Sequence, residues 1–446
     1  MQTITPAAVL SAANVYPGRR YRRNCGIFGD SKASFSWSGG GQNQLAKAFG
    51  LTSHIAAFSG LRAYFPRELN FGVAGETTNQ WMRRLKQAVD APCDIMYVIG
   101  SSNDRRNGTP LSDSKNNALL ITDALTRAGK VVIWFAETPK GSGIYQLTEA
   151  QQKDHIEFHR WALKELPKRG AIVIDAYAEM VDPASALEYP LPDMMMDGAH
   201  QGARGAFIMG RAGAVPLWTL FPEAYNYFGY GATYNLDRNI AGSLTPNPLM
   251  TGTAGTVAAS TVGVGPNPQI ATGWQLANTD GTQPTGLAIE AYKQVDAEGE
   301  WQYFRIAGRL TAPGGGYVLQ ANVAPTDAIL VGDTFQAAAI YEAWGQGIRS
   351  VELAFTAVTT DATPKTTYFA LSDGDPNGAP GPLSSWPTEG RIFRRSAETP
   401  PFTRQATPVF NGATLKMVIH IDDAKDANFV IRVKATGTYK TGWAAP

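Results

Sequence analysis

The sequence has little cysteine, little net charge and no long apolar run, and each shortage excludes a class of protein. It holds 2 cysteines in 446 residues, too few for a disulfide scaffold. The formal net charge is +1, which gives no sustained positive field for a phosphate backbone, so we expect no nucleic-acid partner. No stretch approaches the roughly 20 apolar residues of a membrane helix, and the N-terminus lacks the pattern of a signal peptide. We therefore expect no membrane partner, and the localisation stays unknown.

The two cysteines, Cys25 and Cys93, stand at the starts of two predicted strands. Two buried thiols are the ordinary interpretation of such a pair. The strands are expected to be neighbours, so a disulfide bridge is geometrically open as well. The sequence alone does not decide between the two.

What the chain does have is two differently patterned halves. Apolar runs alternate with helical segments from residue 25 to about 215, which is typical of an α/β domain with a parallel sheet covered on both faces. One helix is expected at 149–166 and another just after His200. Strands are expected at 25–29, 69–74, 94–100, 130–137 and 171–177.

The second half has the pattern of an antiparallel β-sandwich or jelly roll. Short runs rich in aromatic and branched residues are separated there by Gly, Pro and Asp turns. A stretch rich in Gly, Thr and Pro precedes them. We expect a first domain at 1–225, a linker or irregular edge at 226–272 and a β-sandwich at 273–446.

Four short islands of chemically active residues lie in the first half, at 29–31, 75–78, 100–104 and 197–200. Each of the first three follows a predicted strand, and the fourth stands just before the last predicted helix. Because ligands of open parallel sheets bind beyond the carboxyl ends of the strands, we expect the islands to converge at one edge.

The islands contain the parts that nucleophilic acyl transfer needs. Ser31 offers a hydroxyl nucleophile, His200 a base for its proton, and Asp197 a carboxylate that orients the imidazole. The backbone N–H groups of Ser31 and Gly75 and the side-chain amide of Asn103 would form the oxyanion hole. Glycine suits position 75 because the backbone must approach the substrate closely there.

In order and spacing, these blocks resemble the SGNH or GDSL hydrolase family over about residues 20–215. The resemblance implies a flavodoxin-like, doubly wound sheet, the same roles for the five residues just named, and neither a metal nor an organic cofactor. The family usually reads GxND in its third block, whereas here Gly100 stands three residues before Asn103. We therefore expect a rearranged loop. The chain has no GxSxG pentapeptide, which disfavours the α/β-hydrolase nucleophile elbow.

Other residues have both a functional and an ordinary interpretation. Trp37 follows the first island and is a candidate substrate contact, although aromatic residues usually serve in packing. His155 and His159 share a helix face, yet the carboxylate in this segment is placed wrongly for the HExxH zinc motif. We expect a solvated helix face there rather than a metal site.

The leading hypothesis is a serine esterase that removes an acyl group, acetyl above all, from an acylated polysaccharide or oligosaccharide. The β-sandwich would hold the polymer or join a homo-oligomer. The segment 247–274 resembles the start of jelly-roll modules of phage tail and cell-surface proteins, which implies a virion-associated deacetylase of bacterial surface polysaccharide. The alternatives are a non-catalytic glycan-binding or receptor-binding structural protein, a lipase or thioesterase of the same family, and an acyltransferase.

Overall fold

The computed structural model describes residues 21–38, 43–47, 50–221, 228, 242–279, 283–323, 329–359, 365–372, 386–407 and 409–442. The chain divides into two compact units. The first consists of Met1–Trp37 and Phe49–Ala224, and the second of Ser38–Ala48 and Tyr225–Pro446.

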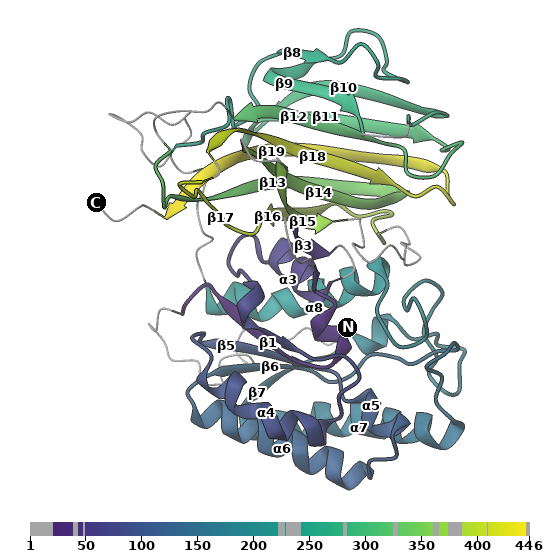
Figure 1. The fold of residues 1–446 in the computed structure, drawn as a ribbon. Coiled ribbons are helices and arrows are strands. Elements are labelled where there is room, and N and C mark those ends of the chain that lie inside the picture. Colours follow the sequence, from purple (N-terminus) through teal and green to yellow (C-terminus); the bar gives the residue numbers. More distant parts are fainter. Residues whose placement is uncertain are drawn as a thin grey trace. The chain divides into compact units, whose positions relative to one another are not determined.

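A five-stranded parallel sheet forms the centre of the first unit, in the order β4-β1-β5-β6-β7. Its strands are β1 (Cys25–Gly29), β4 (Asn70–Gly72), β5 (Ile95–Ile99), β6 (Val131–Phe135) and β7 (Ala171–Ile174). The chain direction along the sheet reverses at β1, which has the second strand of the unit on one side and the third on the other (Figure 1). This is the predicted flavodoxin-like order, and it places a ligand crevice beyond the end of β1.

Helices cover both faces of this sheet (Figure 1). Helices α4, α6 and α7 lie on one face, and α3 and α8 on the other. The helices of the unit are α2 (Ser31–Ser34), α3 (Leu51–Ser59), α4 (Thr78–Asp90), α5 (Ser102–Arg106), α6 (Leu111–Arg127), α7 (Glu149–Glu165) and α8 (Ala203–Leu220), with short 3-10 turns at Arg67–Leu69, Leu166–Arg169 and Tyr177–Glu179. The prediction of an α/β domain is confirmed.

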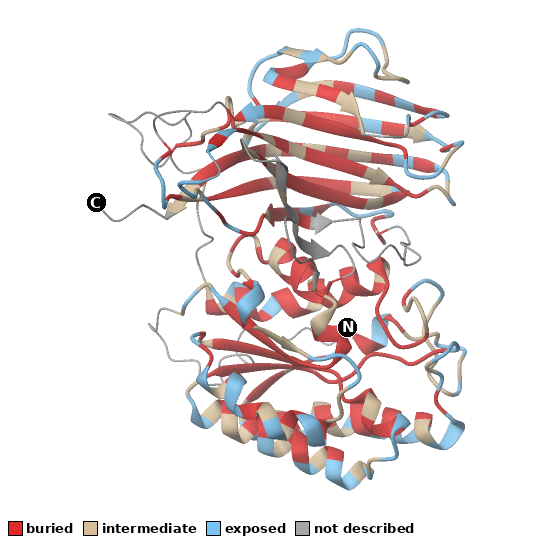
Figure 2. Ribbon diagram, viewed as in Figure 1, coloured by how far each residue is buried: buried red, intermediate tan, exposed pale blue. Residues whose placement is uncertain are grey.

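Local sequence explains where the outer helices begin and which side they bury. Thr77 and Gln80 form a capping box at the start of α4, and Thr148 and Gln151 form one at the start of α7. Each helix then turns an apolar stripe to the sheet, of which β1, β5 and β6 are buried along their length (Figure 2). The inner stripes supply the core residues Trp81, Leu85, Ala88, Ala118, Ile121, Leu125, Phe158 and Ala162.

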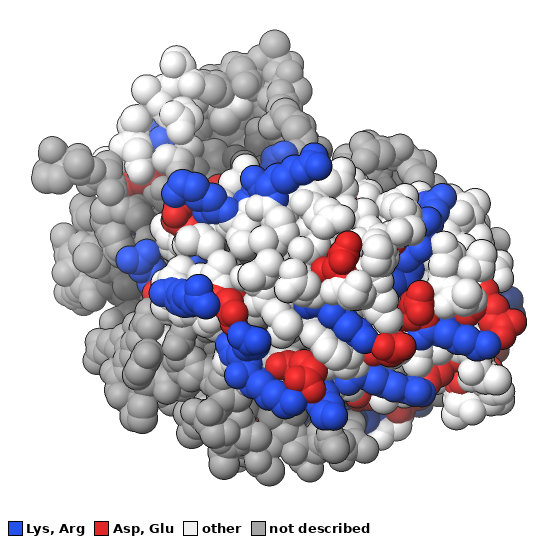
Figure 3. Space-filling model, turned by 90° about the horizontal axis from the view of Figure 1, so that it is seen from below, with Lys and Arg blue, Asp and Glu red and all other residues white. Residues whose placement is uncertain are grey.

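The outer surface of this unit mixes charges of both signs. Figure 3 shows basic and acidic side chains next to one another on the face seen from below. Exposed pairs such as Lys86–Asp90 and Lys153–Glu149 join residues one helical turn apart. This face therefore carries no continuous basic field of the kind that nucleic acid requires.

The second unit contains two largely antiparallel sheets, so the prediction of a β-sandwich is confirmed. One sheet has the order β10-β11-β19-β13-β16, with β17 also on β13, and the other has the order β2-β3-β15-β14-β18-β12-β9-β8 (Figure 1). The strands are β2 (Trp37–Ser38), β3 (Asn43–Lys47), β8 (Ala254–Val257), β9 (Ile270–Asn278), β10 (Leu287–Asp296), β11 (Gly299–Gly308), β12 (Gly316–Val323), β13 (Thr334–Gln346), β14 (Ile348–Thr359), β15 (Lys365–Ser372), β16 (Phe393–Glu398), β17 (Phe402–Thr403), β18 (Phe410–Ile421) and β19 (Ala427–Gly442).

A short segment from early in the chain belongs to this second unit. Strand β3 pairs in parallel with β15, although more than 300 residues separate them. Strand β8 lies within the segment 226–272 and pairs with β9. The division at 1–225, 226–272 and 273–446 stays a prediction, to which the structure adds these two pairings. Among the described helices, none combines the length and apolar character that a membrane span needs.

Candidate active site

Ser31 begins helix α2 directly after strand β1, at the point where the strand order reverses. The preceding residue, Asp30, is the N-cap, and its carboxylate accepts a hydrogen bond of 2.9 Å from the backbone N–H of Lys32. Both Asp30 and Ser31 are buried. The cap holds the turn in one conformation, so the Ser31 hydroxyl points in a defined direction.

The Ser31 hydroxyl, the His200 imidazole and the Asp197 carboxylate form a continuous hydrogen-bonded chain. Ser31 Oγ lies 2.8 Å from His200 Nε2, and His200 Nδ1 lies 2.6 Å from Asp197 Oδ2. The other carboxylate oxygen of Asp197 accepts bonds of 2.9 Å from the Ala199 N–H and 2.8 Å from the His200 N–H. The structure thus brings together three residues from opposite ends of the first unit in a geometry that permits proton transfer.

The same contacts keep Asp197 ionised. Partial burial by itself would raise the pKa of Asp197, but the hydrogen bonds from the His200 ring and from the two backbone N–H groups outweigh it. The net pKa lies below the ordinary value of a carboxyl. An ionised carboxylate on Nδ1 fixes the imidazole tautomer that leaves Nε2 free to accept a proton.

Two backbone N–H groups of the first and second islands have no acceptor among the described residues. Within the described ranges, neither Ser31 N–H nor Gly75 N–H donates to a protein acceptor. Gly75 has φ +80°, and a Cβ at this position would meet nothing within 4 Å. The glycine is therefore required here by backbone conformation rather than by crowding from the protein, and the open space around it is where a substrate would lie.

Arg84 of helix α4 fixes the loop that carries Gly75. Its guanidinium donates to Glu76 Oε2 at 2.5 Å, to Phe71 O at 2.6 Å and to Gly29 O at 2.8 Å. One side chain thus joins the end of β1, the end of β4 and the residue after Gly75. These bonds hold the first two islands in register with each other.

Asn103 lies between the first and second islands. Its Nδ2 donates to Glu76 O at 3.0 Å and makes a longer contact of 3.3 Å with Asp30 Oδ2. The neighbouring Asp104 caps helix α4 by accepting from Thr78 N at 2.8 Å and Thr78 Oγ1 at 2.6 Å. The third island therefore contributes both the amide that faces the site and an anchor for the helix after Gly75.

The unusual spacing of the third island is accommodated by two consecutive residues with positive φ, Gly100 at +119° and Ser101 at +100°. A Cβ on Gly100 would lie 2.5 Å from the Asp30 carboxyl carbon, so only glycine fits there. Ser101 is strained for an L-residue, and its hydroxyl is held by Glu137 and by Arg105, the latter at 2.7 Å. These contacts hold the loop in place, and its rearrangement relative to the family stays a prediction.

A cluster of buried charged side chains lies beneath the nucleophile. Lys32 Nζ donates to Ser102 Oγ at 2.9 Å and lies 3.9 Å from Asp30 Oδ2, while Arg105 lies 3.5 Å from Glu137 Oε1. Burial raises the pKa of Glu137, although Lys32 and Arg105 oppose that shift. The cluster also contains Lys140. Burial and the nearby charge of Lys32 lower the pKa of Lys140 to about 7, although Asp30, Glu137 and Asp197 oppose that shift.

Two aromatic rings enclose the His200 imidazole. The Phe35 ring lies 4.5 Å from it, and the Tyr145 ring meets it edge-on at 5.2 Å. Tyr145 comes from the loop after β6, and this loop is attached to the Asp197 segment by the Gly141 N–H, which donates to Gly198 O at 2.9 Å. The exposed Arg106 of helix α5 lies over the Tyr145 ring, 4.8 Å from its centre.

Three sequence interpretations outside the main site can now be compared with the structure. His155 and His159 are buried, one against Thr138 O at 2.8 Å and the other stacked on Tyr177, so the expected solvated face is wrong. The apolar cover of this face comes from the 3-10 turn after β7, which the helix pattern alone does not show. Within the described ranges, no three His, Cys, Asp or Glu side chains group as a metal site.

Trp37 and the cysteines lie at the border of the first unit and in its core, respectively. Trp37 is half-buried at the start of β2, and its role as a substrate contact stays a prediction. Cys25 and Cys93 are both buried and unbridged. Burial raises the pKa of both thiols, which is typical of structural rather than reactive cysteines.

Sequence reasoning missed the residues that support the site, namely Lys32, Phe35, Arg84, Glu137, Lys140 and Tyr145. One signal was available for some of them. Glu137 and Lys140 stand at the carboxyl end of an otherwise apolar strand. Charges at this end of a strand in a parallel sheet indicate the edge where ligands bind. Nothing in the sequence shows that Arg84 reaches across to two strands.

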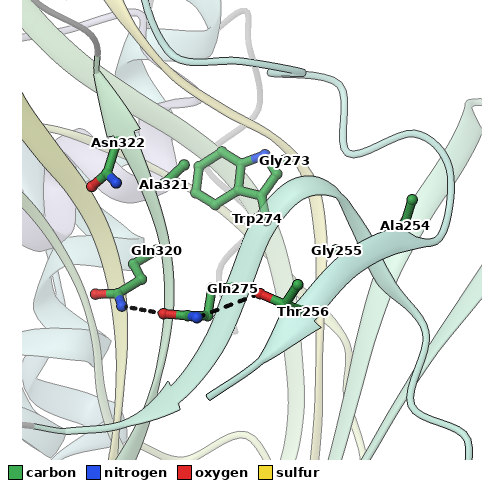
Figure 4. Close-up of a pocket in the computed structure, with 9 residues that line it drawn as sticks. All are labelled: Ala254, Gly255, Thr256, Gly273, Trp274, Gln275, Gln320, Ala321 and Asn322. Atoms are coloured by element: carbon green, nitrogen blue, oxygen red, sulfur yellow. Dashed lines mark hydrogen bonds between the residues drawn. The ribbon is translucent and has the colours of Figure 1, made fainter. Parts of the chain in front are cut away.

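A separate polar hollow of about 300 Å³ lies on the second unit, between β8, β9 and β12 (Figure 4). Gln320 donates to Gln275 Oε1 at 2.9 Å, and Gln275 donates to Thr256 Oγ1 at 3.4 Å. The hollow forms where β9 bulges away from β8, so that Thr256 pairs with Gln275 while Ala254 pairs with Ile270. Its lining consists of amides, hydroxyl and small residues around the buried Trp274.

Comparison with known proteins gives a family for the first unit. Residues 27–206 match the sequence profile of the GDSL-like Lipase/Acylhydrolase family. No curated protein sequence matches the chain.

Solved structures resemble the same part of the chain at low identity. A lipolytic protein of the G-D-S-L family from Desulfitobacterium hafniense is 14% identical over 44% of this chain and 99% of its own, with a TM-score of 0.34. An acylhydrolase from Bacteroides fragilis is 14% identical over 49% of this chain and 97% of its own, with a TM-score of 0.36. An acetylxylan esterase from Geobacillus stearothermophilus is 14% identical over 45% of this chain and 95% of its own, with a TM-score of 0.35. At this level of likeness they say nothing about the substrate of this chain.

Proposed function

The α/β unit of this chain belongs to the GDSL-like lipase/acylhydrolase (SGNH) family, and on this premise we propose that the protein is a serine esterase acting on O-acyl, above all O-acetyl, groups of a carbohydrate. One observation carries the proposal. Ser31 Oγ lies 2.8 Å from His200 Nε2, and Asp197 lies 2.6 Å behind the same imidazole. A hydroxyl in this arrangement can lose its proton while it attacks a carbonyl carbon.

In the first half of the proposed reaction, Ser31 Oγ bonds to the ester carbonyl carbon as its proton passes to His200 Nε2. The carbonyl oxygen becomes an oxyanion, which the N–H groups of Ser31 and Gly75 face without a protein acceptor of their own among the described residues. The bond to the sugar oxygen then breaks, and that oxygen takes the proton from His200. An acyl-serine and a free sugar hydroxyl result.

In the second half, water replaces the sugar. His200 takes one proton from the water as the water oxygen attacks the acyl carbon. The same oxyanion donors stabilise the tetrahedral intermediate. Collapse returns the proton to Ser31 Oγ and releases the carboxylic acid. The set of bonds made and broken requires no oxidant and no reductant.

Asn103 is the third proposed oxyanion donor. One of its two amide hydrogens faces Glu76 O at 3.0 Å, and the contact to Asp30 Oδ2 is longer, at 3.3 Å. The longer contact is the weaker one, so we propose that the amide hydrogen facing Asp30 Oδ2 turns to the oxyanion. The bond to Glu76 O would meanwhile keep the amide plane in place.

The carbohydrate part of the proposal rests on the second unit. The hollow with Thr256, Gln275 and Gln320 offers amide and hydroxyl groups in a row, which match the hydroxyls of a sugar (Figure 4). Bacterial surface polysaccharide is the finer substrate that we propose. Association with a phage tail finds no counterpart in the comparisons and is not carried further.

Hydrolysis of p-nitrophenyl acetate by the wild type and by Ser31→Ala tests the enzyme proposal. The wild type should release p-nitrophenol, and the variant should lose activity by roughly 10⁴-fold or more. The exposed Ser112→Ala on helix α6 is the matched control and should keep the wild-type rate. Equal rates for wild type and Ser31→Ala would reject the esterase and favour the alternative, a glycan-binding protein without turnover.

A further inference from the structure

Arg106 is a charged side chain at the rim of the proposed site whose charge has no protein counterpart. It is exposed at the end of helix α5, and no carboxylate of the described residues forms an ion pair with it. Its two neighbours differ from it in this respect. Arg105 is buried against Glu137, and Asp104 accepts two hydrogen bonds from Thr78.

The position of the Arg106 guanidinium is fixed by an aromatic ring that also contacts the proposed base. It lies over Tyr145 at 4.8 Å from the ring centre, and the Tyr145 ring meets the His200 imidazole edge-on at 5.2 Å. A guanidinium held over an aromatic ring loses less conformational freedom when a ligand binds. Two ring contacts therefore link this cation to the reacting groups.

The helix itself places Arg106 beside the proposed oxyanion donor. Asn103 and Arg106 are three residues apart on α5, and side chains at this spacing share one face of a helix. A substrate whose ester carbonyl approaches Asn103 would thus extend past Arg106. A fixed guanidinium without a protein anion is suited to bind a carboxylate through two parallel hydrogen bonds.

From this placement we propose that Arg106, stacked on Tyr145, binds a carboxylate on the sugar that carries the acyl group, so that the preferred substrates are acylated acidic saccharides such as uronates. This inference rests on the proposed esterase function and narrows its substrate class. It also assigns two roles to Tyr145, which supports the Arg106 guanidinium and packs against the His200 imidazole.

The experiment follows inhibition of p-nitrophenyl acetate hydrolysis by oligogalacturonate and by the same oligomer after reduction of its carboxylates to hydroxymethyl groups. The wild type should be inhibited at least tenfold more strongly by the acidic oligomer, because a hydrogen-bonded charged pair contributes roughly 1.5 kcal/mol or more. Arg106→Gln should remove this difference, measured within each variant as the ratio of inhibition by the two oligomers. Arg106→Lys should retain part of it, because it keeps the charge but not the fork.

The matched control is Arg127→Gln, since Arg127 is exposed at the end of α6 that leads into the start of β6, at the opposite edge of the sheet from the site. It should preserve the preference for the acidic oligomer. Equal inhibition by both oligomers, or a preference that survives Arg106→Gln, would overturn the carboxylate subsite. Stronger inhibition by a sulfated neutral oligomer than by oligogalacturonate would overturn the choice of carboxylate. In each of these cases a Ser31-dependent rate leaves the esterase proposal intact, whereas loss of that dependence rejects both.

Discussion

The two units of this chain bury ionisable side chains in different ways. In the β-sandwich, buried carboxylates pair with cations that are only half-buried, as Asp333 does with Lys440 at 2.6 Å and Glu342 with Arg432 at 2.6 Å. In the α/β unit, buried charged side chains gather around the turn between β1 and α2, which carries Ser31. The members of that cluster are Asp30, Lys32, Asp104, Arg105, Glu137 and Lys140.

The difference separates structural charge from charge held for chemistry. An isolated buried pair neutralises itself and contributes little to stability compared with apolar packing. In the cluster, burial raises the pKa of Glu137 and lowers the pKa of Lys140, and each shift opposes folding at the pH values where the side chain would be charged in the unfolded chain. Such a cluster directly under Ser31 is the arrangement expected where the fold retains an unfavourable feature for function.

The largest effect should come from a neutral replacement of the carboxylate behind the base. Asp197→Asn keeps the shape of the side chain but no longer fixes the imidazole tautomer that frees Nε2. We expect kcat for p-nitrophenyl acetate to fall by roughly 10⁴-fold, with little change in the urea midpoint. Asp193→Asn, in the same segment, is the control and should keep its activity. A fall of less than tenfold in Asp197→Asn would mean that the hydrogen bond to His200 is only structural.

A second pair of variants compares the cluster directly with an ion pair of the sandwich. Glu137→Ala leaves the buried Arg105 without its carboxylate, and we expect a loss of about 3 to 5 kcal/mol in the free energy of unfolding. Asp333→Ala should also destabilise the protein, because it removes a buried carboxylate that pairs with Lys440 at 2.6 Å and accepts from the Leu330 N–H at 2.7 Å.

Only the first of these two variants should also lower esterase activity in the folded protein, since Glu137 holds the Ser101 hydroxyl in the third island. Urea unfolding and steady-state rates at low temperature separate the two effects. If both variants lowered kcat equally, or if neither did, the distinction between the cluster and the ion pair of the sandwich would be lost.

A smaller loss is expected when the side-chain donor of the oxyanion hole is removed. Asn103→Ala should lower kcat by roughly 10² to 10³-fold, while KM changes little, because the donor acts mainly on the charge that develops in the transition state. Asn107→Ala, at the end of the same short helix, is the control. A rise in KM with unchanged kcat would place Asn103 in substrate binding instead.

The sequence was sufficient for the framework of the fold and for the parts that meet at its edge. Strands β1 and β5 and helix α7 were predicted within one residue at each end, because uniform apolar runs and a capping box mark them. The residues Ser31, Asp197 and His200 were placed together because islands at strand ends must converge.

The sequence was insufficient where contacts depend on long side chains or distant pairing. The reach of Arg84 to Gly29 O, and the pairing of β3 with β15, join positions that no local pattern relates. The burial of His155 and His159 was missed for the same reason, since a turn far along the chain covers them. Propensity and periodicity describe single elements, whereas these features belong to pairs of elements.

The smallest effect, and the one that measures the cost of the cluster itself, concerns Lys140. Its pKa in the folded protein is about 7, against roughly 10.4 in an unfolded chain. At pH 6 both states carry the proton, so the folded state bears the full penalty of a buried charge. Between the two pKa values only the unfolded state stays protonated, so the penalty declines as the pH rises.

Lys140→Met should therefore be more stable than the wild type at pH 6, and this advantage should shrink by about 2.7 kcal/mol at pH 9. The groups that act on the amine are Asp30, Lys32, Glu137 and Asp197, and none of them is altered by the substitution. Urea unfolding at the two pH values gives the difference, with the exposed Lys86→Met as a control that should show no such pH dependence. A gain in stability that is the same at both pH values would mean that Lys140 does not titrate in this range. A loss at pH 6 would mean that the three carboxylates compensate for the burial of its charge.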